Sequence, residues 1–351
     1  MSGKTAYKKS RISVTDVARM ANVAHSTVSR VLNNNPNVSS RTREKILSII
    51  SATGYKPLWS ARSLVSQRHN TIGLIFEREH INSLYGARLI EGICDRFAET
   101  GHRLAVGMMH WKSPAESIEE LPLLSTVSVD GLILDLAQIR GDIDAVVSRL
   151  GVPYVYINPS GSRPYNAIMP DDVAAGRAAT QYLIDRGHRR IAFMPHGKNL
   201  NHSSGTDRMH GYARAMSQAG LPLIPGWDEP IEQVYTPDDF ARRLGMYHRE
   251  HGCSAVVCYS TSEAMRTYIV AAQMQIRVPD DVALIGCDVS EAADLFPPSM
   301  PSVQLDRAEM GRMAVDMLLE RIRNPHIDLP TAYHKGKILD NVLTLFTKEL
   351  L

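Results

Sequence analysis

The chain has 351 residues and a formal net charge of +2, and 44% of its residues are hydrophobic. That length exceeds one typical domain, so we expect two or three domains. The N-terminus is polar and basic without the apolar segment of a signal peptide, and no apolar run approaches the ~18 residues that span a bilayer. The pattern therefore argues against secretion and membrane insertion and predicts a cytoplasmic protein.

Charge divides the chain into a basic head and an acidic body. Residues 1–69 contain twelve lysines and arginines and two acidic residues, a net charge of +10. Residues 70–351 contain 27 basic and 35 acidic residues, a net charge of −8. A basic module joined to an acidic body is typical of proteins that bind a polyanion, although a solvated basic surface would give the same count.

The first predicted helix follows Ser13. Asp16, three residues later, completes a capping box with Asp in place of the usual Glu. Apolar residues then recur at helical spacing, at Val14, Val17, Ala18 and Ala21. Asn22 tolerates a left-handed backbone and is expected to end the helix.

Two more helices are predicted before residue 55. The second covers about 25–32 and buries Val28 together with Val31 or Leu32. A loop over 33–37 contains Pro36 and cannot continue the helix. Ser39 is expected to cap a third helix from Arg41 to about Ala52, which ends at Gly54.

Two short helices joined by a tight turn, with a third helix closing the core, form a helix-turn-helix. In that arrangement the second helix enters the major groove and its N-terminal residues reach base edges. Polar side chains suited to base edges are His25, Ser26 and Arg30, and Thr27 and Ser29 lie on the same helix. Hydroxyls suited to phosphates are those of Thr15, Ser39 and Thr42.

Residues 14–33 and 38–43 resemble the head of the lactose-repressor (LacI/GalR) family of transcription regulators, with no gap in the spacing. One departure is Ala24, where the family usually has a Ser that caps the recognition helix. Loss of such a cap costs roughly 1 kcal/mol, so tertiary packing has to hold this helix. His25 suggests an operator half-site that differs from the commonest ones.

The segment after Pro57 is too short to form a stable helix by itself, and composition favours a simple linker. The family resemblance implies a different role. There the matching segment folds into a hinge helix only on operator DNA, where paired leucines of a dimer wedge into the minor groove and kink the duplex. Leu64 falls on the wedge position, and Ala61 lies one turn earlier.

From residue 70 onward, apolar strands alternate with helices, which predicts doubly wound parallel sheets. The predicted strands are 71–76, 104–109, 131–134, 154–157, 190–194, 255–258 and 282–287. The predicted helices lie near 83–99, 114–125, 142–150, 173–186, 207–219, 237–251, 262–274 and 307–323. About 280 residues is long for one such sheet, so we expect two lobes.

The body also resembles the family's effector-binding core, which is similar to periplasmic sugar-binding proteins. The matching segments are 129–134, 187–193, 207–212, 278–282 and 286–288. The resemblance implies a head at 1–57, a hinge at 58–69 and a core at 70–351. It divides the core into lobes of about 70–168 with 305–332 and 169–304 with 333–351.

The effector positions that the resemblance implies are Tyr85, Asp171, Arg208, Tyr235 and Asp288. Arg and Asp can bond vicinal hydroxyls, and an aromatic face can stack on a sugar. Other roles stay open: Asp288, and Asp171 or Asp172, could cap helices, Arg208 could be a surface charge, and the tyrosines could be ordinary core aromatics. Ser260 and Thr261 replace the family's usual Asn-Asp, which leaves the effector's identity open.

Enzyme signatures are missing: there is no GxGxxG, no GxxxxGK[ST] and no HExxH. His202-Ser203-Ser204 is interpreted as a loop lining the cleft rather than a triad, and Asp171 with Asp288 is the only carboxylate pair for a sugar-processing enzyme. The cysteines lie beside apolar segments without metal spacing, so we expect buried thiols, no metal and no cofactor: Cys94, Cys253, Cys258 and Cys287.

The resemblance therefore implies an effector-controlled transcription regulator, usually a repressor, and not an enzyme. A half-site reader implies a homodimer on a near-palindromic operator. Because the chain ends at Leu351 without a leucine heptad tail, a dimer is expected rather than a tetramer. The alternative, a small-molecule binding or transport protein with an incidental basic extension, is disfavoured by the complete head.

Overall fold

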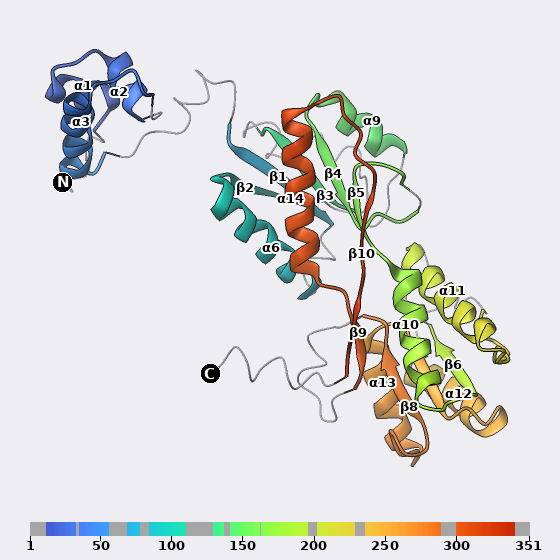
Figure 1. The fold of residues 1–351 in the computed structure, drawn as a ribbon. Helices are drawn as coiled ribbons and strands as arrows, with labels where there is room; N and C mark the ends of the chain where they lie inside the picture. The colour runs from blue at the N-terminus through green and yellow to red at the C-terminus, as the bar shows by residue number, and fades with distance from the viewer. Residues whose placement is uncertain are drawn as a thin grey trace, which may run out of the picture. The chain divides into compact units, whose positions relative to one another are not determined.

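The computed structural model describes residues 12–32, 35–55, 69–77, 84–109, 129–136, 141–161, 163–195, 202–228, 236–288 and 300–340. The chain forms two compact units, residues 1–69 and 70–351 (Figure 1). Among the described residues, no helix is both long and apolar enough to cross a membrane.

The first unit is a three-helix head. Its helices are α1 (Val14–Ala21), α2 (His25–Leu32) and α3 (Ser40–Thr53). They enclose a small core of Val17, Ala18, Ala21, Val28, Val31 and Ile46. The predicted signals act as expected: Ser13 and Asp16 form the capping box of α1, and Asn22 and Gly54 end α1 and α3 at φ 51° and 63°. The predicted helix-turn-helix is therefore confirmed.

The first lobe of the second unit is built on a six-stranded parallel sheet of order β10-β5-β4-β3-β1-β2. Helices α6 and α14 pack against one face through Leu89, Ile93 and Met310, and α9 packs against the other through Val146 and Val147. The strands are β1 (Thr71–Glu77), β2 (Arg103–Met109), β3 (Gly131–Asp135), β4 (Tyr154–Ile157), β5 (Ala167–Pro170) and β10 (Ala332–His334). The helices are α6 (Leu84–Thr100), α9 (Gly141–Arg149) and α14 (Arg307–Arg323).

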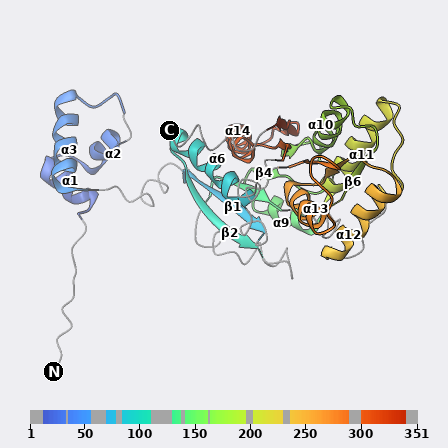
Figure 2. The same ribbon diagram turned by 90° about the horizontal axis from the view of Figure 1, so that it is seen from below.

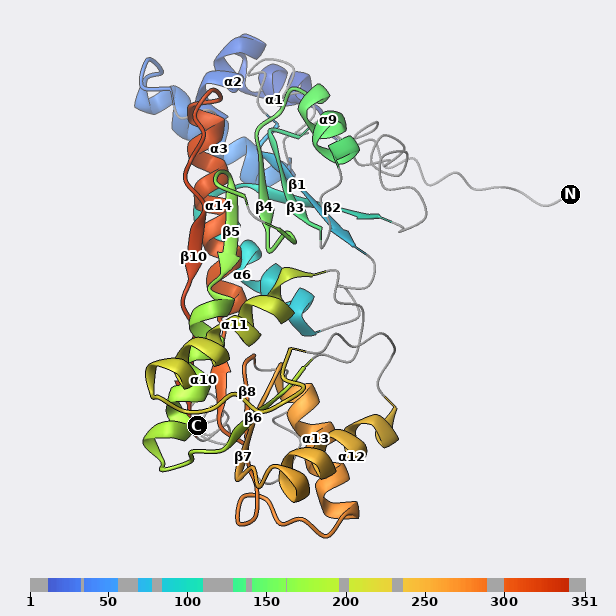
Figure 3. The same cartoon turned by 90° about the vertical axis from the view of Figure 1, so that its right-hand side faces the viewer.

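The second lobe has a five-stranded sheet of order β11-β9-β8-β7-β6, in which only β11 is antiparallel. Figure 3 labels its strands β6, β7 and β8. The strands are β6 (Ile191–Met194), β7 (Ala255–Cys258), β8 (Ala283–Gly286), β9 (Ser302–Gln304) and β11 (Lys337–Leu339). Helices α10 (Asp172–Asp185) and α11 (Ser203–Gln218) cover one face. The other face is covered by α12 (Pro237–Gly245), the π-helical turn η1 (Met246–Glu250) and α13 (Thr261–Gln273). The predicted architecture, two doubly wound lobes, is confirmed.

In the described part of the chain, three connections pass from one lobe to the other. The crossings lie between β5 and α10, between β9 and α14, and between β10 and β11. The expected lobe boundaries at 168 and 332 fall inside β5 and β10, which both belong to the first sheet. Because these strands are only four and three residues long, they carry little periodic signal, and β5, β9, β10 and β11 were not predicted.

Other predictions need correction. Helix α11 begins at Ser203, four residues before the predicted start, so His202-Ser203-Ser204 is a helix start and not a loop. Cys94 is exposed, because it lies on the side of α6 away from Ile93 and the core, while Cys253, Cys258 and Cys287 are buried as expected. The predicted helix 114–125 lies outside the described residues.

Candidate DNA interface and effector site

Helix α2 presents the predicted base-reading residues, with His25 and Ser26 in its first turn and Arg30 in its last turn. His25, Ser26 and Arg30 are exposed, and Thr27 and Ser29 are partly buried. The methyl group of Ala24 cannot accept a hydrogen bond, so the Ala24 carbonyl alone receives the Thr27 and Val28 amides, at 2.9 and 3.4 Å. The helix is anchored instead by Val28 and Val31, which are 0% and 2% exposed.

The predicted phosphate-binding hydroxyls lie at two helix starts. Thr15 is exposed in the first turn of α1. Ser39 caps α3: its Oγ accepts the Thr42 amide at 3.4 Å and lies 2.9 Å from the Thr42 Oγ1. Helix starts carry partial positive charge, so hydroxyls and amides at these positions suit phosphate oxygens.

Four predicted site residues have no described side chain. Ala61, Leu64 and Tyr235 lie outside the described residues, and Tyr85 lies in α6 with a side chain that is not described. Their roles remain those that the family resemblance implies.

Arg208 is more buried than Asp171 and Asp288, the other predicted effector residues whose side chains the structure describes. Its guanidinium donates from Nε to Asp172 Oδ1 at 2.7 Å, from Nη1 to the Tyr259 carbonyl at 2.8 Å and from Nη2 to Asp288 Oδ2 at 3.0 Å. The guanidinium also lies over the Tyr259 ring, 4.4 Å from its centroid. The side chain is 3% exposed, so the surface-charge interpretation is wrong.

Two glycines bring Arg208 to Asp172. A Cβ atom on Gly176 of α10 would lie 2.0 Å from the Arg208 carbonyl oxygen, and one on Gly211 of α11 would lie 2.2 Å from the Val173 carbonyl oxygen. The two helices therefore touch backbone to backbone at these glycines, and they are neighbours in the ribbon (Figure 2). This contact sets the first turn of α10 against the first turns of α11.

Asp288 links the two lobes. It follows β8 in the second lobe, and its Oδ2 accepts from Arg208 and, at 2.6 Å, from Arg307 at the start of α14 in the first lobe. Its side chain is 18% exposed, compared with 3% for Arg208. Asp288 is thus the predicted effector residue whose carboxylate is both bonded across the lobes and partly open to solvent.

Asp171 acts as a helix cap. Its Oδ1 accepts the Ala174 amide at 2.9 Å at the start of α10, and the neighbouring Asp172 is the residue that pairs with Arg208. Sequence reasoning treated Asp172 only as a second capping candidate and did not single out Tyr259 or Arg307. The sequence carries no local signal for this role, because first-turn carboxylates also occur at exposed positions, as Asp238 does in α12.

Electrostatics keep Arg208 charged, whereas burial raises the pKa of its partner Asp172. Burial by itself lowers the pKa of Arg208, but the carboxylate of Asp172, then Tyr259 and Asp288, outweigh burial and raise that pKa well above its ordinary value. Burial also raises the pKa of the Tyr259 phenol above 10, with Arg208 opposing the change. At neutral pH, Arg208 is therefore a cation and the Tyr259 hydroxyl is protonated.

Ser260 and Thr261, which replace the family's usual Asn-Asp, have their hydroxyls bonded within the second lobe. The Ser260 Oγ accepts the Ser262 amide at 3.1 Å and donates to Glu263. The Thr261 Oγ1 donates to the Asp288 carbonyl at 3.0 Å, and Thr261 is fully buried. Thr261 therefore holds the backbone at Asp288, and Ser260 caps the start of α13.

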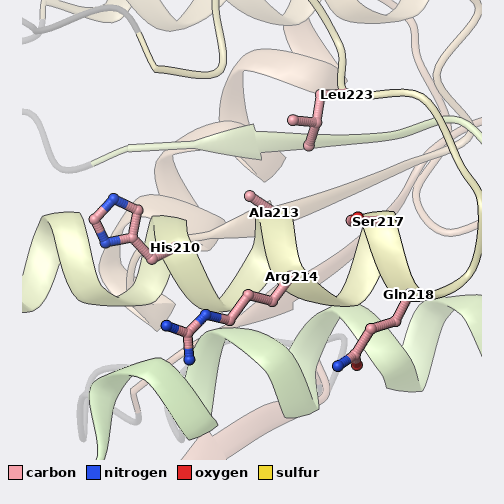
Figure 4. A pocket seen from close by; sticks show the side chains of 6 residues that line it. All are labelled: His210, Ala213, Arg214, Ser217, Gln218 and Leu223. Atoms are coloured by element: carbon pink, nitrogen blue, oxygen red, sulfur yellow. The ribbon is translucent and has the colours of Figure 1, made fainter.

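A separate open hollow lies on the outer side of α11 (Figure 4). It is lined by His210, Ala213, Arg214, Ser217, Gln218 and Leu223. Of the described residues that line it, none is a predicted effector residue. Among the described residues, no group of three or more His, Cys, Asp or Glu side chains could hold a metal ion.

The chain matches two family models. Residues 13–57 match "Bacterial regulatory proteins, lacI family", and residues 180–336 match "Periplasmic binding protein-like domain". The ribose operon repressor of Haemophilus influenzae is 31% identical over 89% of this chain and 92% of its own length.

Two solved structures resemble the whole chain. The transcriptional regulator CelR in complex with cellobiose has 27% identity and a TM-score of 0.65, covering 94% of this chain and 99% of its own. The lac repressor dimer bound to operator and the anti-inducer ONPF has 22% identity and a TM-score of 0.75, covering 94% and 98%. The latter likeness shows the fold.

The folded head and the two-lobed body are the two parts that the family models match, and the repressor relative covers both. The chain belongs to the lacI family of bacterial regulatory proteins and is a DNA-binding transcription regulator, not an enzyme.

Proposed function

We propose that the protein is a repressor that binds a near-palindromic operator as a homodimer and is controlled by a small molecule bound between its lobes. The observation that carries the DNA-binding part is the folded head with His25, Ser26 and Arg30 exposed on α2. The lac repressor structure, a dimer on operator, supports the dimeric state by analogy. Such a protein works in the cytoplasm, at the nucleoid.

The DNA-contacting set comprises the residues of the head and of the hinge that the family resemblance implies: Thr15, His25, Ser26, Thr27, Ser29, Arg30, Ser39, Thr42, Ala61 and Leu64. Selection of duplexes from a random library by the full-length protein tests this part. We expect enrichment of two inverted half-sites, because a two-fold dimer repeats its reading heads. Enrichment of single, unpaired sites would contradict the dimer.

The effector part rests on the cluster around Asp288. We propose that Asp288, Asp171, Tyr85 and Tyr235 contact the effector and that Arg208 acts mainly by holding the Asp288 carboxylate. Carboxylate oxygens suit ligand hydroxyls, and the cellobiose complex of CelR supports a sugar-like effector.

A melting screen of sugars and related metabolites on the full-length protein tests the effector class. A ligand that binds only the native state at 100 times its Kd stabilises it by about 2.7 kcal/mol, a readily measured shift. A sugar that raises the melting temperature of the wild type should have a much weaker effect on Asp288→Asn. If no carbohydrate raises the melting temperature while another metabolite class does, the sugar-like assignment is wrong.

A further inference from the structure

A chain of hydrogen bonds runs from the Arg208 cluster to the first lobe. The Tyr259 hydroxyl lies 2.8 Å from the Ser204 Oγ, which lies 2.9 Å from Nδ1 of His202. Nε2 of His202 lies 2.9 Å from the carbonyl oxygen of Asn158, which follows β4 in the first lobe. The Tyr259 relay is defined here as Tyr259, Ser204, His202 and Asn158.

The Asn158 carbonyl fixes the direction of every bond in the relay. A carbonyl only accepts, so Nε2 of His202 carries the proton and Nδ1 accepts, as it also does from the Ser204 amide at 3.2 Å. The Ser204 hydroxyl then donates to Nδ1 and accepts from the Tyr259 hydroxyl. Hydrogen bonds that all point the same way polarise and strengthen one another.

Both ends of the relay are held in place. Asn158 has a left-handed backbone with φ 48°, and its amide donates to the Ile168 carbonyl at 2.8 Å, so its carbonyl is fixed beside the start of α11. At the other end, the Tyr259 ring and carbonyl both contact the Arg208 guanidinium. The relay therefore begins at Tyr259, which contacts Arg208, and Arg208 in turn holds the Asp288 carboxylate.

A second set of bonds across the lobes depends on the same helix start. The Ser203 amide donates to the Ser160 Oγ at 3.1 Å, and the Gly161 amide donates to the Ser203 Oγ at 3.4 Å. His202 caps α11 immediately before Ser203. A movement of His202 will therefore displace Ser203 and weaken its bonds to Ser160 and Gly161. The protection of the backbone amides in segment 158–161 thus depends on whether the relay is intact.

We propose that Tyr259 is a positioning residue that couples the effector cluster to lobe closure, by holding Arg208 with its ring and carbonyl and by donating its hydroxyl to the relay. A ligand bonded to Asp288 competes with Arg208 and Arg307 for that carboxylate. The resulting shift of Arg208 over the Tyr259 ring is passed through Ser204 and His202 to Asn158. The regulatory meaning of this coupling rests on the proposed function, whereas the relay itself does not.

Hydrogen exchange measured by mass spectrometry on the full-length protein, without ligand or DNA, tests the relay. Tyr259→Phe keeps the ring and carbonyl and removes only the donated hydroxyl. We expect roughly two- to tenfold faster exchange in segment 158–161, the change that corresponds to the loss of one net hydrogen bond. Exchange in β7 and β8 should stay at the wild-type rate.

Matched variants separate the relay from a general loss of stability. Tyr182→Phe removes another phenol hydroxyl of the second lobe, one bonded to Asp340, and should leave segment 158–161 unchanged. His202→Ala cuts the next link, and the double variant with Tyr259→Phe should exchange no faster than His202→Ala by itself, because linked sites are not additive. Ser204→Ala replaces Tyr259→Phe if that variant does not fold.

Wild-type exchange at 158–161 in Tyr259→Phe, or strictly additive effects in the double variant, would overturn the relay. Neither result would affect the duplex selection that tests the proposed function. Conversely, a failure of that selection would leave the exchange result standing, so the two claims are separable.

Discussion

At the scale of single residues, the buried charges of the second lobe carry the clearest energetic consequence. Arg208 has two carboxylates as partners, and removal of one member of a buried ion pair typically costs 3–5 kcal/mol because the other charge is left uncompensated. We expect Arg208→Ala to lower the free energy of unfolding by about that amount in a urea titration.

Arg214→Ala is the matched control, because Arg214 lies on the exposed side of the same helix. It should change the free energy of unfolding by less than about 0.5 kcal/mol, as surface substitutions usually do. Equal effects of the two variants would mean that the Arg208 cluster contributes nothing special to stability.

Arg30 on the exposed face of α2 is expected to read a base of the operator. Arg30→Ala should lower affinity for the selected operator by about 1–3 kcal/mol and relax the base preference at one position of each half-site, since an Arg pairs bidentately with guanine. Fluorescence anisotropy at fixed salt measures both effects.

The control removes the same charge from a different helix. Arg19 lies on α1 with a side chain 77% exposed and pairs with Asp16. Arg19→Ala should weaken all sequences about equally and leave the base preference unchanged. A base preference that survives in Arg30→Ala would show that Arg30 does not read the operator.

At the scale of elements, the contact between α10 and α11 positions the whole Arg208 cluster. A methyl group on Gly176 would meet the Arg208 backbone 2.0 Å away, so the helices would have to separate. We expect Gly176→Ala to destabilise the protein by about 1–3 kcal/mol, as overpacking does. Thermal unfolding is the measurement.

Gly245→Ala supplies the comparison. Its added methyl group would meet only the Met274 Cε, at 3.5 Å, and the residue already has a helical backbone. It should be neutral or stabilise the protein by up to about 1 kcal/mol. If both substitutions had the same effect, the close approach of α10 and α11 would not be what makes Gly176 necessary.

Elements with a local signal were predictable from the sequence, and elements without one were not. Ser13, Asp16, Asn22 and Gly54 mark helix ends by their own chemistry, so the head was predicted almost residue by residue. The short strands β9, β10 and β11 exist because distant strands pair with them, which no local pattern records. The same holds for the site. Arg208 was identified through the family resemblance of the sequence, whereas Tyr259 and Arg307 enter the cluster around Arg208 and Asp288 only through tertiary packing.

As a whole, the protein is proposed to combine a DNA-reading head, a hinge and a two-lobed sensor. Leu64→Ala tests the hinge, which the family resemblance assigns to the minor groove. The variant should lose operator affinity while the head stays folded, as judged by unchanged exchange protection in α1 and α3. Wild-type affinity in a gel-shift assay would remove Leu64 from the interface.

The central claim is that a small molecule held between the lobes controls DNA binding. Anisotropy titration of the full-length protein with its selected operator, with and without a ligand that raises its melting temperature, tests the claim most directly. We expect a change of about 5- to 150-fold in operator affinity at saturating ligand, the usual range of coupling between two sites. Identical operator affinity with and without the bound ligand would contradict it.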